Sequence, residues 1–406
     1  MTINQAITSQ RIAAIQQDIS AGKAGVLEEF WREATHQGTP LIELISGDSK
    51  LALVTFLWRD ANSAANPAII CSIAFPAEKD PLTHIPGTDV WFKTYTVPRD
   101  TLDTYQFAVG TSNQLDPLNS RVHIFSSDEE NDFKGWKSSI FELPDARPQP
   151  WSNPITGTPA GEIVLHRFQS KTLGEERRIW IYRPHEFSLQ NEPYGLIVVF
   201  DGNMYLDLIP VPTILDNLVA AHRIPPLVGV LIGSVADKTR DRDLQCYPPY
   251  LDFLAREIIP WIRRNCHVTT DPHKTVVAGL SAGGLAAAFA GLRFPDIFGN
   301  ILSNSGSFSW KPDDETEYEW ISRQYAESPQ LPLQFYLDAG YYELGTERDD
   351  AASILLSNRH LRNVLKAKGY PVHYQEFSGG HNPANWRGTF ADGLLALIGT
   401  DKTSMS

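Results

Sequence analysis

The stretch KTVVAGLSAGGLAAAFAGLRFP, residues 274–295, determines the fold of the second half of the chain. It begins with a short apolar run, TVVAG (275–279), which is typical of a buried strand. A run of small and apolar residues follows, and we expect it to form a helix over 283–293. Ser281 therefore lies at a junction between a strand and a helix.

The pattern Gly279-x-Ser281-x-Gly283 at this junction is that of a nucleophile elbow. A nucleophilic serine in such a turn has a strained backbone that exposes its hydroxyl above the sheet, and the glycines let strand and helix approach closely. The N-terminus of the following helix offers N–H groups to a developing oxyanion. The sequence therefore predicts Ser281 as a catalytic nucleophile rather than a small turn residue.

Apolar runs and helical patterns alternate on both sides of Ser281. The expected strands are 177–184, 195–202, 227–233, 275–279, 333–340 and 372–377. The expected helices lie near 211–222, 250–265, 283–293, 350–368 and 385–398. This alternation predicts βαβ units and a mostly parallel sheet.

The first part of the chain has a different pattern. Two helices are expected over 9–20 and 23–35, followed by β-type runs at 51–58, 67–75, 90–97 and 104–110. Several short strands separated by turn residues indicate a β-sandwich. The Pro-rich stretch 142–161 separates the two parts, because its prolines prevent regular structure. We therefore predict a first domain over 1–145, a linker over 146–161 and a second domain over 162–406.

Composition excludes several other classes of protein. The 406 residues carry a net charge of −13, which disfavours general binding to nucleic acids or anionic membranes. The three cysteines form neither a disulfide framework nor a zinc motif. The first residues contain no apolar segment typical of a secretory signal, and no apolar run is long enough to span a membrane. We expect a cytoplasmic protein without a metal or other cofactor.

A nucleophilic serine needs a base and an acid that orients the base. His381 follows the last expected strand in SGGHNPANWR (378–387), the position at which hydrolases with this sheet present their histidine. Two carboxylates after the preceding strand compete for the role of the acid. Asp338 is still within the strand, whereas Glu343 lies in the following loop and is better placed to reach an imidazole. We favour Glu343 and keep Asp338 as the alternative.

Other residues are candidates for binding the substrate. The backbone N–H of Ala282 and one from Gly202 or Asn203, after an earlier strand, would form an oxyanion hole. The expected loop 235–244 supplies Arg240 and Arg242, with Lys238 as a third cation, near the carboxyl edge of the sheet. The alternative for these cations is a set of exposed surface pairs. Further candidates in the histidine loop are Trp386, which is equally compatible with the core, and Arg387.

Several motifs resemble known families. The second part is similar to the esterase D group of α/β-hydrolases, in LDAGYYE (337–343) and in the histidine loop. The resemblance places the acid three residues after a glycine, which supports Glu343. The stretch 105–120, with LDPLN, resembles early-set, immunoglobulin-like sandwich domains. Together with FDGNMY (200–205) and GLSAGG (279–284), these motifs resemble the enterochelin (ferric enterobactin) esterases of enteric bacteria along nearly the whole chain.

The resemblance implies a serine esterase that cuts the three ester bonds of the cyclic siderophore enterobactin, giving 2,3-dihydroxybenzoyl-serine units and helping to release iron. Iron(III) would enter as part of this small-molecule substrate. Since the ferric complex is trianionic and the chain is acidic, a local basic patch is required. The alternative is a feruloyl or carbohydrate esterase with a glycan-binding first domain. A third possibility, a binding protein on an inactive hydrolase fold, is disfavoured by the intact Ser281 and His381.

Overall fold

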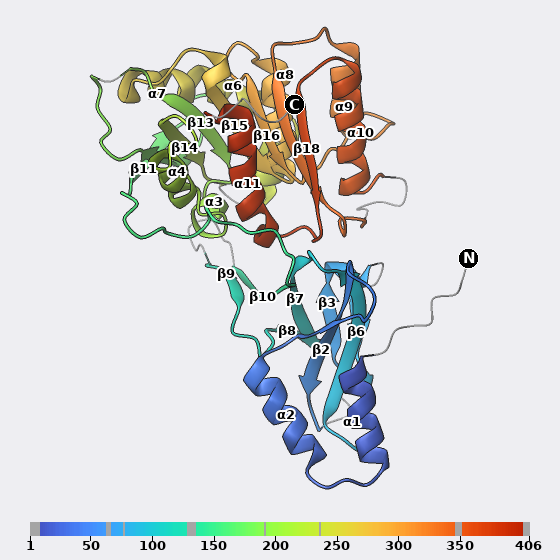
Figure 1. The fold of residues 1–406 in the computed structure, drawn as a ribbon. Helices are drawn as coiled ribbons and strands as arrows, with labels where there is room; N and C mark the ends of the chain where they lie inside the picture. Colours follow the sequence, from blue (N-terminus) through green and yellow to red (C-terminus); the bar gives the residue numbers. More distant parts are fainter. Residues whose placement is uncertain are drawn as a thin grey trace. The chain divides into compact units, whose positions relative to one another are not determined.

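The computed structural model describes residues 9–61, 66–75, 78–127, 135–190, 192–234, 237–345 and 351–400 (Figure 1). The chain forms two compact units. The first consists of Met1–Ile124, Trp136–Arg147 and Ser378–Ala384, and the second of Phe125–Gly135, Pro148–Phe377 and Asn385–Ser406. The predicted second domain is therefore not one continuous segment, because the residues around His381 group with the first unit.

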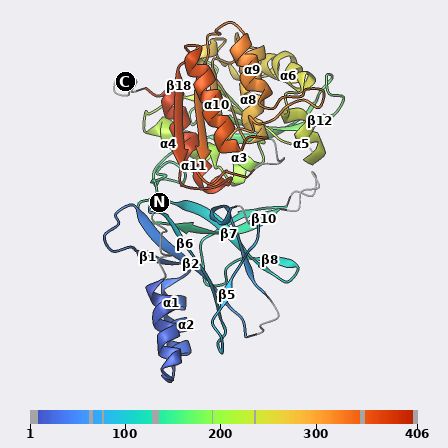
Figure 2. The ribbon, with the colours of Figure 1, turned by 90° about the vertical axis from the view of Figure 1, so that its right-hand side faces the viewer.

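The first unit contains two sheets that pack face to face. Four strands form the first sheet, in the order β1 (Leu41–Leu44), β2 (Leu51–Arg59), β6 (Val90–Pro98) and β5 (Thr83–His84), all labelled in Figure 2. The second sheet has the order β4 (Asp80–Pro81), β3 (Ala68–Cys71), β7 (Leu102–Val109), β10 (Trp136–Glu142) and β9 (Val122–Phe125), with β8 (Ser112–Gln114) paired to β7. The short 3₁₀ turn η2 (Ser72–Ala74) follows β3.

Alternating side chains of these strands explain the packing of the first unit. Phe56, Phe107 and Phe141 belong to one buried cluster between the two sheets. Leu57, the neighbour of Phe56, belongs instead to a cluster with Trp31 and other residues of the helices α1 (Gln10–Ser20) and α2 (Val26–Gln37). Because successive side chains of a strand point to opposite faces, β2 contacts the second sheet on one face and the helices on the other.

The second unit is built on one eight-stranded sheet. Its order is β11 (Glu162–Gln169), β12 (Glu176–Arg183), β14 (Leu227–Ile232), β13 (Gly195–Phe200), β15 (Thr275–Leu280), β16 (Asn300–Asn304), β17 (Gln334–Gly340) and β18 (Val372–Phe377). β11 pairs antiparallel with β12, and β12 pairs antiparallel with β14, while the other neighbouring pairs are parallel. The sheet is therefore mixed. β11 and β16 were not expected from the sequence.

Helices cover both faces of this sheet. One buried cluster joins it to α6 (Pro248–Phe253), the π turn η4 (Leu254–Ile258), α7 (Ile259–Cys266), α8 (Ala282–Arg293), α9 (Trp320–Glu327) and α10 (Ile354–Ala367). The cluster on the opposite face includes α3 (Met204–Asp207), α4 (Val211–Ala220) and α11 (Pro383–Ile398), and Figure 1 shows α11 in front of the sheet. The short 3₁₀ helix η5 (Pro272–Lys274) precedes β15.

Two further observations concern the fold as a whole. The prediction of a loop over 235–244 is wrong for most of this segment, because Asp237–Leu244 form the helix α5. Leu244 of this helix is buried in the core. Within the part of the chain that the structure describes, no helix is both long and apolar enough to cross a membrane.

Candidate active site

Ser281 occupies a strained turn between β15 and α8, as the sequence predicted. Its backbone has φ 54° and ψ −121°, a conformation that non-glycine residues rarely adopt. Two hydrogen bonds hold the turn: Ser281 N donates to Asn304 O at 2.9 Å, and Ser307 N donates to Ser281 O at 3.0 Å. The strained backbone is thus fixed by the neighbouring strand β16 and by the segment that follows it, and the side chain lies at the N-terminus of α8.

The close approach of β15 and α8 depends on Gly279. A Cβ atom at this position would lie 2.3 Å from the backbone carbon of Gly283, which cannot move without the helix. We expect Gly279→Ala to lower the free energy of unfolding by more than about 2 kcal/mol, because both elements would have to shift. Denaturant unfolding measures this loss.

Gly283→Ala is the matched control for that substitution. A Cβ at Gly283 would meet its nearest atom, Asp201 Oδ2, at 3.4 Å, an ordinary contact, and alanine favours a helix over glycine. Its stability should match or slightly exceed that of the wild type. An equal loss in both variants would contradict the assignment of the close approach to Gly279.

A cavity of about 230 Å³ opens beside Ser281 within the second unit. The Ser281 Oγ lies 3.2 Å from Ser307 Oγ. The lining includes polar, cationic and aromatic residues from three segments: Arg240, Ser281, Ala282, Ser307, Trp310, Lys311 and Tyr318. The structure therefore places the nucleophile candidate in a pocket that carries two cations, two aromatic rings and the two carboxylates of Asp241 and Asp313.

Four of these lining residues were not identified from the sequence: Ser307, Trp310, Lys311 and Tyr318. They follow β16, a short strand with polar ends whose sequence NILSN gave little β signal. β16 pairs in parallel with β15, so both strands end at the same edge of the sheet. Had this strand been identified, the segment after it would have been predicted to lie beside Ser281.

The candidates for the oxyanion hole differ in what their N–H groups do. Ala282 is the first residue of α8, where N–H groups have no partner within the helix. The N–H of Gly202 donates to Ile232 O at 2.8 Å and so serves the fold. Among the described residues, the N–H of Asn203 makes no hydrogen bond. The structure thus favours Asn203 over Gly202 as the second donor.

The loop that carries these residues also binds Arg240. Asp201 is 1% exposed and has φ 54°, and its two carboxylate oxygens accept hydrogen bonds from Arg240 Nε at 2.8 Å and Nη2 at 2.7 Å. Ser234 Oγ donates to the same carboxylate at 2.6 Å. This bidentate pair orients the Arg240 guanidinium at the cavity.

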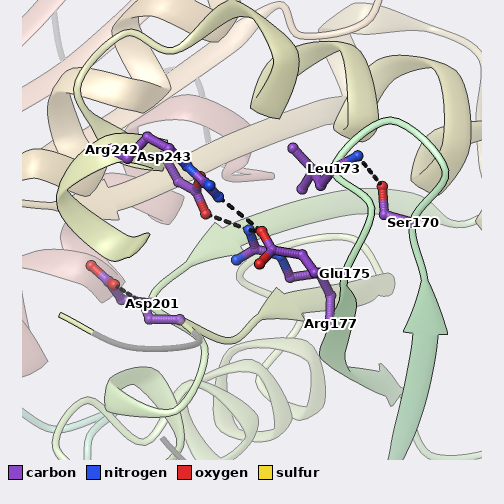
Figure 3. Close-up of polar contacts among 8 residues, drawn as sticks. Ser170, Leu173, Glu175, Arg177, Asp201, Arg242 and Asp243 are labelled. Carbon is purple, nitrogen blue, oxygen red and sulfur yellow. Dashed lines mark hydrogen bonds and ion pairs between the residues drawn. The ribbon is translucent and has the colours of Figure 1, made fainter. Parts of the chain in front are cut away.

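Arg242 lies elsewhere, in a separate ion-pair network. It donates through Nε to Asp243 Oδ1 and through Nη2 to Glu175 Oε1, each at 2.8 Å. The buried Arg177 bonds the same two carboxylates, as Figure 3 shows. Arg242 is not among the residues that line the cavity. The side chain of Lys238 lies outside the described residues.

The two candidate acids have different surroundings. Asp338 is 0% exposed and accepts hydrogen bonds from Asn304 Nδ2 at 2.6 Å and Ser305 N at 2.9 Å. Burial raises the pKa of Asp338 to about 7, although bonds from Thr389, Asn304 and Ser305 oppose the shift. Glu343 is 5% exposed, and its Oε2 accepts a bond from Gly340 N at 3.0 Å. Asp338 is therefore tied into the end of the sheet, while Glu343 extends beyond it.

His381 belongs to the segment Ser378–Ala384, which groups with the first unit. Its side chain is exposed, and the residues on either side of it are buried. This placement was not expected, since the chain passes here from β18 to α11 and the sequence assigned the segment to the second domain.

The two residues proposed near the histidine are held within the second unit. Trp386 is 2% exposed, and its Nε1 donates to Ser305 Oγ at 2.9 Å, so it lies in the core and offers little surface to a ligand. Arg387 donates through Nη2 to Ser152 O and Asn153 Oδ1, at 3.2 and 3.1 Å. Burial lowers the pKa of Arg387. Neither residue lines the cavity beside Ser281.

Metal-binding residues do not gather in the described part of the chain, where no group of three or more His, Cys, Asp or Glu side chains could hold a metal ion.

Comparisons of the sequence give consistent matches. Residues 170–397 match the model of the putative esterase family, and residues 53–152 match that of the enterochelin esterase N-terminal domain. The chain is 30% identical to the iron(III) enterobactin esterase of Dickeya dadantii, over 94% of this chain and 95% of the relative. It is 26% identical to the iron(III) salmochelin esterase of Escherichia coli O6:H1, over 96% and 98% of the two chains.

Solved structures of similar proteins agree with these matches. The ferric enterobactin esterase from Salmonella typhimurium has a TM-score of 0.75 with 26% identity, covering 91% of this chain and 98% of the other. The enterobactin esterase from Shigella flexneri, solved in the presence of enterobactin, has a TM-score of 0.72 with 25% identity, covering 91% and 97%. Both units thus have counterparts in single relatives of similar length.

Proposed function

Since the chain belongs to the iron(III) enterobactin esterase family, we propose that it hydrolyses the ester bonds of enterobactin and of its iron(III) complex. The observation that carries this proposal is the strained Ser281 in a cavity that also holds Arg240 and Lys311. A catecholate complex of iron(III) is anionic, and Arg240 and Lys311 are the cations of this cavity that would contact it, beside the carboxylates of Asp241 and Asp313 that also line it.

The mechanism we propose is acyl transfer through Ser281. His381 accepts the proton of the Ser281 hydroxyl as its Oγ attacks the ester carbonyl, and the N–H groups of Ala282 and Asn203 bind the resulting oxyanion. The tetrahedral intermediate collapses, and His381 returns the proton to the departing alkoxide. Water, deprotonated by His381, then attacks the acyl carbonyl, and His381 gives this proton to the Ser281 oxygen as the acyl group leaves. Glu343 orients the imidazole and does not take its proton.

The products would be 2,3-dihydroxybenzoyl-serine units, with iron(III) entering as part of the substrate. The sequence-based expectation of a cytoplasmic location stays a prediction, as does that of an enzyme without a cofactor.

We also infer finer classes for the two units. The two facing sheets of the first unit support an early-set, immunoglobulin-like sandwich. The largely parallel sheet with a serine turn after its central strand supports an α/β-hydrolase in the second unit.

Product analysis tests the proposed substrate against its rival. The purified protein is incubated separately with enterobactin, iron(III) enterobactin and methyl ferulate, and products are separated by chromatography. We expect dihydroxybenzoyl-serine to appear from the siderophores much faster than ferulate is released from its ester. Faster release of ferulate would support the feruloyl or carbohydrate esterase and would reject the siderophore assignment.

Arg240 should contribute to binding of the anionic substrate. Arg240→Gln removes one of the two cations of the cavity and leaves its partner Asp201 in place, and we expect KM for iron(III) enterobactin to rise about tenfold, equivalent to ~1.4 kcal/mol. KM for a small neutral aryl ester should stay the same, because no anion is then bound. Steady-state kinetics with both substrates at two salt concentrations measures the difference, which salt should diminish.

Arg256→Gln is the control for this substitution, since the Arg256 side chain is 73% exposed and pairs only weakly with Asp252, at 3.6 Å. Both kinetic constants should match those of the wild type. Should Arg240→Gln raise KM equally for the neutral ester, the effect would be a general distortion of the pocket and the charge argument would fail.

A further inference from the structure

The seven residues Ser378–Ala384 form an unusual loop. All of them group with the first unit, although β18 and most of α11, on either side in the sequence, belong to the second. Six of the seven are buried, and the exposed one is His381. Because the residues on both sides of His381 are buried, the contacts that hold this loop also determine where the exposed histidine side chain begins.

The residue three positions before the histidine is bound twice. Ser378 O accepts a hydrogen bond from Leu102 N at 3.0 Å, and Ser378 Oγ donates to Asp100 Oδ1 at 2.7 Å. Leu102 is the first residue of β7, and Asp100 lies two residues before it. This end of the loop is therefore fixed to a strand of the first unit by a backbone bond and a charge-assisted bond.

The side-chain amide of the residue directly after the histidine makes two hydrogen bonds, one through its nitrogen and one through its oxygen. Asn382 Nδ2 donates to Asp103 Oδ1, while Asn382 Oδ1 accepts from Ala384 N at 3.1 Å and so caps the start of α11. Asp103 is 0% exposed, and its Oδ1 also accepts from Thr104 N at 2.7 Å. A buried carboxylate of β7 thus fixes the amide next to His381.

The backbone between these two ends lies directly against the first unit. A Cβ on Gly380 would be 1.8 Å from Ser72 Oγ and 2.2 Å from Ser72 Cβ, while the next contact, Asp103 Oδ2, would be at an ordinary 3.4 Å. Ala384 joins a small buried cluster with Leu102 and Ala146. Only glycine fits beside Ser72, so the approach itself is encoded in the sequence.

We propose that the first unit positions the catalytic histidine, with Asp103 as the central positioning residue. The inference rests on the proposed function, in which His381 is the base. According to this inference, the first unit affects kcat and not only substrate binding. β7 and Ser72 fix the backbone on both sides of His381, and Asp103 holds Asn382. Without these contacts the loop, and with it the imidazole of His381, would no longer have a fixed position.

The test uses the full chain, a neutral activated aryl ester and a fluorophosphonate label. We expect Asp103→Ala to lower kcat about 10²-fold, the cost of misplacing a catalytic group by roughly 1 Å, with KM unchanged. Labelling of Ser281 should slow in parallel, because both reactions need the base. Asp103→Asn keeps the Oδ1 acceptor for Asn382 and should recover most of the rate.

The matched control is Asp116→Ala in the same unit. Asp116 is 2% exposed and accepts bonds from Tyr105 Oη at 2.7 Å and Leu118 N at 2.9 Å, without contacting the histidine loop. This variant should have a lower free energy of unfolding than the wild type and an unchanged kcat. Asp103→Ala would overturn the proposal if it raised KM and left kcat intact, or if both variants lost kcat equally.

A second pair of variants tests the approach at Gly380. Gly380→Ala should lower kcat, and adding Ser72→Gly, which removes both clashing atoms, should restore it. Additive losses in the double variant would contradict the packing argument. The readouts separate this inference from the proposed substrate: an enzyme that cleaves the aryl ester but not enterobactin loses only the substrate assignment. A wild type that reacts with neither probe overturns both.

Discussion

Ser281→Ala is expected to lower kcat on iron(III) enterobactin by about 10⁵–10⁶-fold, because the nucleophile and its base act as one unit. KM should change little, since the hydroxyl contributes to bond making rather than to binding. Residual hydrolysis would come from the oxyanion donors, which do not depend on the serine side chain. Product chromatography under saturating substrate measures the loss, and a fluorophosphonate should label the wild type but not the variant.

Ser307 supplies the control, because its hydroxyl is 3.2 Å from that of Ser281 in the same cavity. Ser307→Ala removes one hydrogen bond, worth about 1 kcal/mol, and should cost about tenfold or less. The double variant Ser281→Ala with His381→Ala should be no slower than Ser281→Ala alone. A labelled Ser281→Ala protein, or a larger loss from Ser307→Ala, would move the nucleophile to Ser307 and reject the elbow assignment.

The position of Ser281 could be predicted because its signal is local. A strand, a GxSxG turn and a small-residue helix are adjacent in the sequence, and the structure places β15, the positive φ of Ser281 and α8 accordingly. Most strands of the second unit were found for the same reason, since buried parallel strands are short apolar runs. β16 was missed because Asn300 and Asn304 make it look polar, although both are buried and hydrogen-bonded.

Features that depend on partners distant in the sequence could not be predicted. Arg240 and Arg242 are two residues apart and chemically identical, but Arg240 pairs with Asp201 at the cavity, while Arg242 pairs with Glu175 and Asp243. The placement of the histidine loop depends on Asp103 and Ser72, about 300 residues earlier in the chain. The sequence of the loop has no pattern from which such partners could be predicted. Its two adjacent glycines indicate only that its backbone lies close to another part of the chain.

Replacing the acid of the catalytic triad should have the second large effect on kcat. We expect Glu343→Gln to lower kcat by about 10³–10⁴-fold, because a neutral amide neither stabilises the imidazolium nor enforces the correct tautomer. Asp338→Asn should cost about tenfold or less, the equivalent of a single weakened hydrogen bond. Kinetics at pH 8 with an activated ester, which does not depend on the natural substrate, measures both variants.

The pKa of Asp338 explains why it is the weaker candidate. Burial raises that pKa to about 7, so near neutral pH the carboxyl is ionised only in part, whereas the acid of a triad must remain charged. Between about pH 4 and 7 the Asp338 carboxyl is protonated in the native state and ionised in the unfolded chain. Its contribution to the free energy of unfolding therefore falls as the pH rises through this range.

Asp338→Asn removes that pH-dependent loss and preserves the shape of the side chain. Its stability relative to the wild type should therefore increase from pH 5 to pH 8, which denaturant unfolding at the two values can show. If Asp338→Asn instead lost as much kcat as Glu343→Gln is expected to lose, while Glu343→Gln remained active, the acid would lie at the end of β17 and the loop after it would serve only the fold.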